Sequence, residues 1–382
     1  MKIYDTIILG AGAAGLKAAA TLYTRKKSVL IIDMGDAPAR KVAISGGGNC
    51  NFTNLAANYT RYFGKNPRFV VSALNQFSPQ DTINWVKAHH IKYTEKEPGR
   101  YFCQNGASDI VDALLLDIGN TEIKYNTNVI NATKDKDTFT VHTNHGNFSA
   151  SSLIVATGGV SYAHLSVSNT GTVIAKTFGH KIEPVRPGLC AIKTTAFDSC
   201  LAGISLPVEI TSNKKTVRDN MLFTHFGIGG PAAYRVSLFM NKQIIINFAP
   251  TLDIFSYLKA AKQTNGKRGI VSVIATLLPN KLAKFLWPND TRNIADWRDS
   301  ELRAIADKIT RFEITDAASI GFESAEVMFG GISTDKISSK TMESLICPGL
   351  YFAGEVIDIT GDLGGFNLQW AFSSGFVAGS NA

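Results

Sequence analysis

The clearest hydrophobic pattern lies in the first 33 residues, where two apolar runs flank a helical segment. Residues 4–9 form an apolar run of strand length with several β-branched side chains. Residues 16–23 are rich in alanine and have a high helix propensity. Residues 29–32 are a second apolar run, which ends at Asp33. This order predicts a β-α-β unit, the building block of a parallel sheet.

Further apolar patterns predict the elements that extend this unit. Helices are expected within 68–90 and over 107–118 and 172–178, and strands over 122–125, 128–132, 138–143, 147–148 and 153–157. Thr170 is the expected N-cap of the helix over 172–178. The strands between 122 and 148 predict a small antiparallel addition, whereas the apolar strand over 153–157 belongs in the core of the sheet.

The composition changes at Val185, which predicts an insertion. Strands are expected over 189–195, 208–211 and 243–248, helices over 252–262, 269–285 and 300–310, and then a strand over 350–353 and a helix over 366–378. The expected fold class is α/β, a Rossmann-type domain with a parallel sheet, interrupted by a β-barrel-like and helical insert. The Rossmann-type domain would comprise residues 1–188 and 326–382, the β-barrel-like insert 189–250 and 311–325, and the helical insert 251–310.

Composition and charge bear on the class of protein. The chain has 382 residues, of which 45% are hydrophobic and 18% charged, as in globular proteins of more than one domain. No stretch reaches the roughly 18 uninterrupted apolar residues of a membrane span, so no membrane association is expected. The net charge of +8 is spread over scattered Lys and Arg residues, so no nucleic-acid partner is expected.

The cysteines and histidines predict neither a disulfide framework nor a metal site. The five cysteines are widely spaced and contain no CxxC pair, which disfavours structural zinc and a dithiol redox centre. A reducing cytoplasm is the expected setting. The seven histidines lack ligand spacing, so no metal is expected.

Three glycines between the first strand and the first helix fit the dinucleotide-binding fingerprint GxGxxG. Gly10 allows a tight turn, Gly12 lets the backbone approach a pyrophosphate, and Gly15 allows close packing of helix and strand. The free amides at the helix N-terminus attract phosphates. Asp33 is placed to accept hydrogen bonds from an adenosine ribose. Ala14 and Met34 complete the predicted cofactor-binding set of this unit.

A second glycine-rich stretch follows at residues 40–54 and includes three consecutive glycines. Such a run is expected to form a loop whose backbone amides approach the cofactor. Cys50 is either a reactive thiol or a small packing residue, and packing is favoured because no histidine stands beside it in sequence. The cofactor-binding residues predicted here are Arg40, Lys41, Ser45, Gly46, Gly47, Gly48, Asn49, Cys50 and Asn51.

A second anchor for the cofactor lies near the C-terminus. A short strand ends at Gly354 and Glu355, whose carboxylate can hold ribityl hydroxyls. Gly364 and Gly365 open the last helix, whose N-terminal amides can face the N1–C2=O edge of a flavin and stabilise its anionic reduced form. Because FAD spans both anchors, FAD is the predicted cofactor. The residues predicted on this side are Thr157, Gly158, Gly354, Glu355, Asp358, Gly364, Gly365, Phe366 and Asn367.

Three single residues carry weaker signals. His225 precedes a Gly-Gly-Pro turn, and it either orients substrate or exchanges a proton near a flavin, or holds the turn by hydrogen bonds. Arg100 could face an acidic substrate, but a surface salt bridge is the favoured interpretation. Val129 lies on a strand whose backbone could face the adenine, as in many FAD domains.

These motifs resemble those of the BaiN/RdsA-like, or aminoacetone-oxidase-like, family of bacterial FAD-dependent oxidoreductases. The resemblance covers essentially the whole chain and rests on residues 40–41 with 45–54, 156–159, 222–232, 349–358 and 364–367. It implies an FAD-binding Rossmann domain with β-barrel-like and helical inserts. It also implies Asp33 at the adenosine ribose, Arg40, Lys41 and 46–51 along the pyrophosphate and ribityl chain, and Glu355, Asp358 and 365–367 on the flavin side.

Three positions depart from the pattern of this family. Position 33 is Asp where Glu is more usual, so the shorter acid needs a closer approach. Gly229 replaces a usual serine, which removes any hydroxyl role there. Cys103 stands where Pro is frequent, which leaves the shape of that loop open.

We therefore expect an FAD-dependent oxidoreductase that transfers hydride or electrons through flavin N5 between NADH, NADPH or a small organic substrate and an acceptor. The loop 161–168 and the insert are expected to shape the substrate pocket, and His225 is the candidate catalytic residue. Two alternatives stay open. A flavin-dependent RNA-modifying enzyme fits the net charge but lacks an aromatic–basic patch in the sequence, and a flavin redox sensor would bind FAD without turnover. The sequence names neither the organic substrate nor the oligomeric state.

Overall fold

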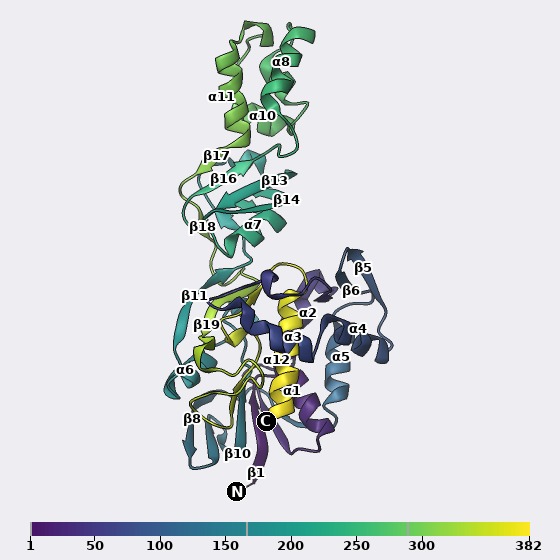
Figure 1. Ribbon diagram of the computed structural model, residues 1–382, viewed down its shortest axis with the longest axis vertical. Coiled ribbons are helices and arrows are strands. Elements are labelled where there is room, and N and C mark those ends of the chain that lie inside the picture. The colour runs from purple at the N-terminus through teal and green to yellow at the C-terminus, as the bar shows by residue number, and fades with distance from the viewer. Residues whose placement is uncertain (1, 166, 289) are drawn as a thin grey trace. The chain divides into compact units, whose positions relative to one another are not determined.

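The computed structural model describes residues 2–165, 167–288 and 290–382 (Figure 1). The chain divides into two compact units, Met1–Arg186 with Glu326–Ala382, and Pro187–Ala325. Ser166, within the loop expected to shape the substrate pocket, lies outside the described residues. The two units are described separately below.

The first unit is built on a mostly parallel sheet with the strand order β7-β2-β1-β10-β9-β8, and β20 pairs with β10. The parallel strands are β1 (Ile3–Leu9), β2 (Val29–Ile32), β7 (Glu122–Lys124), β10 (Gly146–Val155) and β20 (Leu350–Phe352). An antiparallel edge follows, formed by β8 (Val129–Asp135) and β9 (Thr138–Thr143). The Rossmann-type parallel sheet is thus confirmed.

One long strand replaces two that the sequence pattern predicts. The patterns over 147–148 and 153–157 both belong to β10. The polar residues between them interrupt the apolar pattern, but Ser149 continues the pairing, opposite Ile3 on one side and Thr140 on the other. Backbone pairing on both edges therefore maintains the strand where side-chain hydrophobicity does not.

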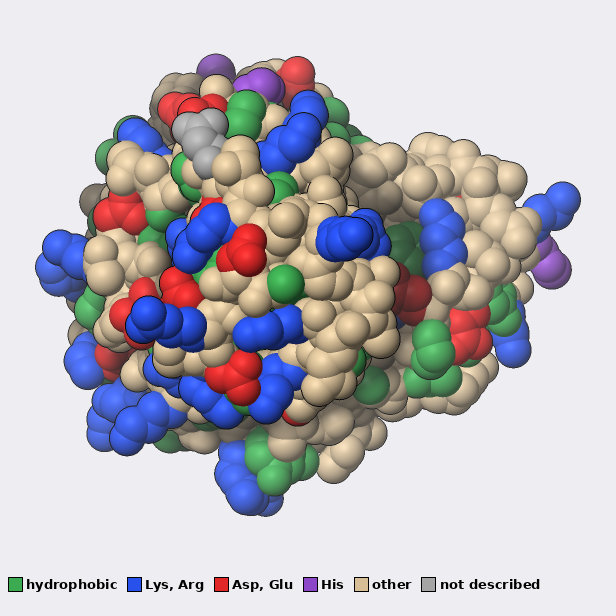
Figure 2. All heavy atoms as spheres, turned by 90° about the horizontal axis from the view of Figure 1, so that it is seen from above, with side chains coloured by type: hydrophobic (Ala, Val, Ile, Leu, Met, Phe, Trp, Pro, Cys, Tyr) green, Lys and Arg blue, Asp and Glu red, His purple; other side chains and the backbone are tan. Residues whose placement is uncertain are grey.

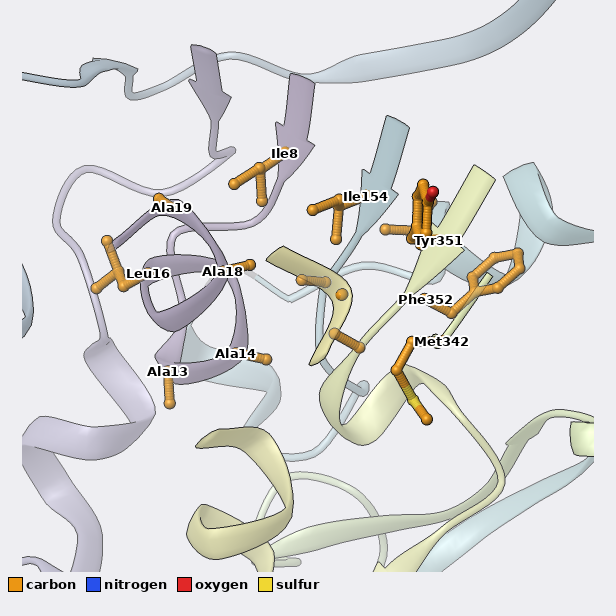
Figure 3. Close-up of a cluster of buried hydrophobic side chains, with 14 of the residues drawn as sticks. Ile8, Ala13, Ala14, Leu16, Ala18, Ala19, Ile154, Met342, Tyr351 and Phe352 are labelled. Carbon is orange, nitrogen blue, oxygen red and sulfur yellow. The ribbon is translucent and has the colours of Figure 1, made fainter. Parts of the chain in front are cut away.

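Helices α1 (Ala13–Thr24) and α12 (Phe366–Asn381) pack closely because small residues line their contact (Figure 1). A Cβ at Gly375 would collide with the carbonyl of Ala14, and one at Gly379 with the carbonyl of Ala18. Figure 3 shows Ala14 and Ala18 of α1 among the buried side chains that surround Ile8 and Ile154 of the sheet. The two ends of the chain therefore share one core.

The other elements of the first unit cover the sheet or carry loops. The helices are α2 (Arg40–Ile44), α3 (Val70–Gln76), α4 (Pro79–Ala88), α5 (Ser108–Asp117) and α6 (Thr170–Thr177). The shorter strands are β3 (Asn51–Asn54), β4 (Tyr62–Phe63), β5 (Tyr93–Glu97), β6 (Arg100–Cys103), β11 (Ile182–Gly188), β19 (Val327–Ile332) and β21 (Thr360–Gly361).

The predicted N-cap of α6 is wrong. Thr170 is the first helical residue, and Asn169 occupies the N-cap position. The Thr170 hydroxyl instead accepts a hydrogen bond from Ser168 Oγ at 2.8 Å, so it is engaged outside the helix.

The second unit contains an antiparallel sheet with the strand order β17-β16-β13-β14-β15-β12-β18. Its strands are β12 (Ile192–Lys193), β13 (Ser205–Ser212), β14 (Lys215–Thr224), β15 (Gly227–Gly229), β16 (Ile244–Asn247), β17 (Phe312–Ile314) and β18 (Ala318–Ser319). The strand expected over 189–195 shortens to β12. The sequence analysis missed β14 because the polar residues 218–220 interrupt its apolar pattern, and it missed α7 (Gly230–Ser237), which packs on β14.

Four helices lie between β16 and β17, namely α8 (Ile254–Thr264), α9 (Ile270–Ile274), α10 (Asn280–Leu286) and α11 (Asp299–Thr310). The single helix expected over 269–285 is wrong, because Pro279 stands between α9 and α10 and disfavours helical geometry in the residue before it. Leu258, Leu282 and Leu302 are fully buried between these helices. Among the described residues, none of the helices combines the length and the hydropathy needed to cross a membrane.

Candidate dinucleotide site and its relatives

The turn between β1 and α1 has the conformation that the glycine fingerprint requires. Gly10 has a φ of +106°, and a Cβ there would collide with the carbonyl of Ala156. A Cβ at Gly15 would collide with the carbonyl of Gly10. The Cβ position of Gly12, in contrast, has no atom within 4 Å, and Gly12 is the N-cap of α1. Packing therefore requires glycine at positions 10 and 15. Gly12 instead leaves open space at a helix N-terminus that can hold a phosphate.

Asp33 holds this turn from the end of β2. Its carboxylate accepts hydrogen bonds from Ala11 N at 2.6 Å and Gly35 N at 2.7 Å, and it lies 3.4 Å from Arg40 Nη2. Met34, next in the chain, is half-buried. These contacts give Asp33 a role in shaping the turn, and its contact with a ribose stays a prediction.

The segment that leads into β8 lies beside Asp33. Thr127 N donates to the Asp33 carbonyl at 2.9 Å, and Asn126 N donates to the Gly35 carbonyl at 2.8 Å. Val129, at the start of β8, is therefore two residues from this contact. Its backbone is therefore near Asp33 at the end of β2, and its contact with an adenine stays a prediction.

The three consecutive glycines form a turn with exposed backbone directly after α2. Gly46 and Gly47 have φ values of +58° and +65°, in the left-handed region that favours glycine. No atom lies within 4 Å of the Cβ position at Gly47 or Gly48. Hydrogen bonds from Cys50 N to Ser45 O at 3.0 Å and from Ala107 N to Gly48 O at 2.7 Å fix the ends of the turn. A fixed turn with open backbone suits an anionic ligand.

Lys41 and Glu355 form an ion pair between the two predicted anchors. Lys41 Nζ lies 2.6 Å from Glu355 Oε2 and donates to Ser161 Oγ at 2.7 Å. Glu355 also accepts hydrogen bonds from Met328 N at 2.7 Å and Ser161 Oγ at 3.1 Å. The sequence analysis identified both charged residues and placed Ser161 in the loop 161–168, but it did not assign Ser161 to the cofactor site.

Two polar side chains, Thr157 just after β10 and Glu326 just before β19, form no hydrogen bond or ion pair with the residues that the structure describes. Thr157 Oγ1 is buried and has no hydrogen-bond partner among the described residues. The backbone carbonyl of Glu326 accepts a hydrogen bond from Ser161 Oγ at 3.3 Å. Burial raises the pKa of the Glu326 carboxyl to about 7. Gly158, with a φ of +70°, has its Cβ position 3.8 Å from Glu355 Oε2. An open α/β sheet binds its ligands at this end of its strands.

Two glycines precede the last helix, as the sequence pattern predicts. Gly364 and Gly365 have φ values of +110° and +88°, and Gly365 is the N-cap of α12. A Cβ at Gly365 would collide with the backbone of Thr53. With its amide oriented to satisfy its neighbours, Asn51 accepts a hydrogen bond from Gly365 N at 3.2 Å, which joins the residues after the glycine turn to the start of α12.

Phe366 and Asn367 use their side chains for the fold. Phe366 is fully buried and makes an edge contact with Tyr62 at 6.2 Å between ring centroids. Asn367 Oδ1 accepts from Gly361 N at 2.7 Å, and its Nδ2 donates to Gly361 O at 3.0 Å. Any contact of these two residues with a cofactor would therefore come from the backbone.

Gly354 and Asp358 have different surroundings although both were predicted on the flavin side. Gly354 is held between Ser374 Oγ, 2.9 Å from its nitrogen, and Trp370 Nε1, 3.1 Å from its oxygen. The Asp358 carboxylate accepts from Lys65 N at 2.9 Å, and burial raises its pKa to about 6. Asp358 thus holds the backbone at Lys65 and shares no hydrogen bond with the Lys41–Glu355 pair among the described residues.

The donor set fits a dinucleotide such as FAD. The glycine turns at Gly12 and at Gly46–Gly48 can offer backbone amides to phosphates, and the Lys41–Glu355 ion pair adds a donor and an acceptor for further polar groups of the ligand. The unpartnered hydroxyl of Thr157 indicates that a polar group is missing from this end of the sheet.

The chain matches the family described as HI0933-like protein Rossmann domain over residues 4–381. It belongs to this family. The ribosomal RNA dihydrouridine synthase of Escherichia coli is 37% identical over 99% of this chain and 97% of that protein, and the protein of the same name from Haemophilus influenzae is 39% identical over 98% and 97%. The 3-dehydro-bile acid delta(4,6)-reductase of Clostridium scindens is 26% identical over 98% of both chains. The resemblance found in the motifs is confirmed.

Two buried thiols, those of Cys50 and Cys103, are hydrogen-bonded to each other in this HI0933-like chain. Cys50 and Cys103 are free and buried, and a hydrogen bond between the two thiols lowers the pKa of Cys50 and raises that of Cys103. Cys103 N donates to Asn49 O at 3.0 Å, a bond that proline could not make, so the loop as it stands requires a residue with a backbone N–H at this position. Burial favours packing over a solvent-accessible reactive role for Cys50.

His225 and Arg100 lie in different units. His225 is exposed in the turn between β14 and β15 of the second unit, and its ring makes no hydrogen bond with the residues that the structure describes. The Arg100 guanidinium pairs with Glu97 at 2.7 Å in the first unit, which favours the salt-bridge interpretation. Within the ranges described, no group of three His, Cys, Asp or Glu is arranged to hold a metal ion.

Proposed function

We propose that this protein is an FAD-dependent reductase that converts uridine in ribosomal RNA to dihydrouridine, with NADH or NADPH as electron donor. The observation that carries the proposal is the match to two relatives named ribosomal RNA dihydrouridine synthase, at 37% and 39% identity over nearly the full length of both chains. The proposal adopts the RNA-modifying alternative and departs from the expectation of a small substrate and no nucleic-acid partner. That expectation rested on the scatter of basic residues along the sequence.

The first unit supplies the residues that would hold FAD. The Cβ positions of Gly12, Gly47 and Gly48 have no atom within 4 Å, so a ligand can approach the backbone there, and the amides of these two turns would bind the phosphates. Lys41 and Glu355 would lie along the part of FAD that joins the phosphates to the flavin, where Lys41 would face the negative pyrophosphate and Glu355 the ribityl hydroxyls. When bound, FAD supplies hydride transfer between the nicotinamide donor and the substrate.

Reduction of uridine also requires a proton. The C5=C6 bond gains a hydride at one carbon and a proton at the other, while the nicotinamide donor is oxidised. A group that donates this proton needs a pKa near the working pH. Glu326 meets this condition, because burial raises the pKa of its carboxyl to about 7 and its backbone contacts Ser161 of the Lys41–Glu355 group. His225, which is exposed in the turn between β14 and β15 of the second unit, stays an alternative donor.

The charge of the second unit supports an RNA substrate. Residues 187–325 contain seventeen Lys and Arg against twelve Asp and Glu, so this unit carries more than half of the net charge of +8. Figure 2 shows Lys and Arg side chains spread over the drawn face of the molecule, between fewer acidic ones. A positive surface attracts the phosphates of RNA independently of sequence.

The test begins with the visible spectrum of the purified protein under anaerobic conditions, before and after NADH and then NADPH. The reduced protein is then mixed with ribosomal RNA that lacks dihydrouridine, and the digested nucleosides are examined by mass spectrometry. The expected result is a flavin spectrum that bleaches with one donor, and a uridine that gains two hydrogens. A flavin that bleaches without any change in the RNA would contradict the proposal and favour a small organic substrate. A flavin that no donor reduces would favour the sensor alternative.

A further inference from the structure

Phe226 differs from every other phenylalanine in the chain. The sequence contains 22 phenylalanines, all within the described residues, and Phe226 is the only exposed one, at 44%. It lies in the turn between β14 and β15 of the second unit, directly after His225, which is also exposed. Two adjacent aromatic rings are thus exposed at the tip of a hairpin, where a ligand can reach them.

The backbone of this turn is fixed. Thr224 and Gly227 face each other across the hairpin, and Thr194 N of the neighbouring chain segment donates to Phe226 O at 3.1 Å. Gly227 has a φ of +147°, and a Cβ there would collide with the carbonyl of Ile192. The turn therefore presents its rings from a rigid frame, which lowers the entropy lost when a ligand binds.

The polar groups around the turn suit a nucleotide. Lys193 lies opposite Gly227 in the β12–β15 register, is exposed, and forms no ion pair within the described parts of the chain. Thr224 Oγ1 is buried and has no hydrogen-bond partner among the residues described.

One acidic residue lies near the turn. Both oxygens of the Asp316 carboxylate are bound by the hydroxyls of Thr194 and Thr195 and by Thr195 N, at 2.5 to 2.8 Å. Its charge is thus stabilised by three hydrogen bonds, which lower its pKa to about 2, and it does not pair with Lys193.

We propose that this turn is a contact site for single-stranded RNA, where Phe226 and His225 stack on unpaired bases and Lys193 binds a phosphate. The inference rests on the proposed function, because a uridine must leave its stack before its C5=C6 bond can be reached, and unstacked bases gain from a new aromatic partner. Interleaved aromatic and basic side chains are how proteins bind single strands. The site was not visible in the sequence because β12 brings Lys193 to the turn from more than thirty residues away.

The ring of Phe226 is tested by exchanging it for side chains that keep or lose its flat face. The probe is a fluorescein-labelled oligouridylate, and binding to the FAD-loaded protein is followed by anisotropy. Removing one base–aromatic stack is expected to weaken binding about 5- to 150-fold in Phe226→Leu, whereas Phe226→Trp retains the affinity. Tyr257→Leu is the matched control, because Tyr257 is an aromatic of the same unit exposed to 37%.

Lys193 is tested through the salt dependence of the same binding. Lys193→Ala is expected to reduce the slope of log affinity against log salt by roughly 0.7, as for one phosphate contact with a single strand. Phe226→Leu should leave the slope unchanged, since stacking involves no counterion release. Thermal unfolding and the rate of flavin reduction by the nicotinamide donor should match wild type in both variants, which excludes misfolding.

The outcomes separate this inference from the proposed function. If wild type forms dihydrouridine in ribosomal RNA but Phe226→Leu and Lys193→Ala bind the probe as wild type does, the inference fails and the function stands. If wild type forms no dihydrouridine and does not bind the probe, both fail. Loss of affinity in Phe226→Leu but not in Phe226→Trp or Tyr257→Leu supports the inference.

Discussion

Lys41 Nζ lies 2.6 Å from Glu355 Oε2, so the residue that begins the second predicted loop is bound to the acid that follows β20. The Glu355 side chain is 19% exposed and the Lys41 side chain 29% exposed, so water screens the pair only in part. The pair joins segments 314 residues apart in the sequence, and both segments were predicted to contact the same cofactor.

The first prediction concerns the charge of Glu355. Glu355→Gln keeps the size of the side chain but removes the charge that orients Lys41 and the strongest acceptor for ligand hydroxyls. We expect the affinity for FAD to fall about tenfold or more, as when a hydrogen bond to a charged group is lost. The measurement is a fluorescence titration of the flavin-free protein with FAD.

The control for this prediction is Glu209→Gln. Glu209 pairs with Arg218 in the second unit, which contains none of the predicted cofactor-binding residues. Equal FAD affinities of Glu355→Gln and Glu209→Gln would contradict the role given to Glu355.

The second prediction separates two glycines of one motif. Gly12→Ala places a methyl group where no atom lies within 4 Å, at a φ of −80° that alanine adopts easily. We expect Gly12→Ala to unfold at the wild-type temperature but to retain little FAD, because its methyl group occupies the space for the phosphates. In Gly15→Ala the new Cβ collides with the carbonyl of Gly10, so we expect loss of soluble folded protein. Circular dichroism and the flavin content after purification give both readouts, and a Gly12→Ala protein with full flavin content would overturn the assignment.

The Rossmann core could be predicted because its residues signal locally. Residues 29–32 were predicted as a strand from four consecutive apolar side chains, and β2 has those same bounds. The spacing of Gly10, Gly12 and Gly15 indicates the role of each residue. In the structure a Cβ would collide with backbone at Gly10 and Gly15, whereas the Cβ position of Gly12 is open.

The rest of the site depends on contacts that no local pattern encodes. Ser161 has no motif around it, and it reaches the site only because β10 and β19 bring it to Lys41 and Glu326. In the same way, Asn367 carries a family motif but uses its side chain on Gly361. The strands of the second unit were harder to predict. β14, for example, is stabilised by pairing with β13, and its own residues do not form a continuous apolar pattern.

The third prediction concerns thiol accessibility. Cys200 is the only exposed cysteine, and the other four are buried and free. We expect an aromatic disulfide reagent to modify one thiol rapidly in the native protein and five after unfolding. Cys200→Ser should remove the rapid reaction. Rapid reaction that persists in Cys200→Ser would show that the Cys50–Cys103 pair opens to solvent in the native state.

The last prediction follows from the buried carboxyl of Glu326. Burial raises its pKa from 4.5 to about 7. Between pH 4.5 and 7, the folded protein therefore keeps a proton on this carboxyl that the unfolded chain has already lost. In this window the unfolded state binds fewer protons, and stability therefore falls as pH rises. The free energy of unfolding should lose on the order of 3 kcal/mol between about pH 4.5 and 7, and no more above it.

Glu326→Gln cannot ionise and should escape this loss. Its stability relative to wild type should be flat below pH 4.5, increase up to about pH 7, and then stay constant. Urea unfolding at a series of pH values measures the difference directly. Glu323→Gln is the matched control, because Glu323 is an exposed acid three residues away and should show no such gain. If Glu326→Gln and wild type change in parallel over the whole range, the Glu326 carboxyl is ionised in the folded protein, and it could not serve as the proton donor near neutral pH.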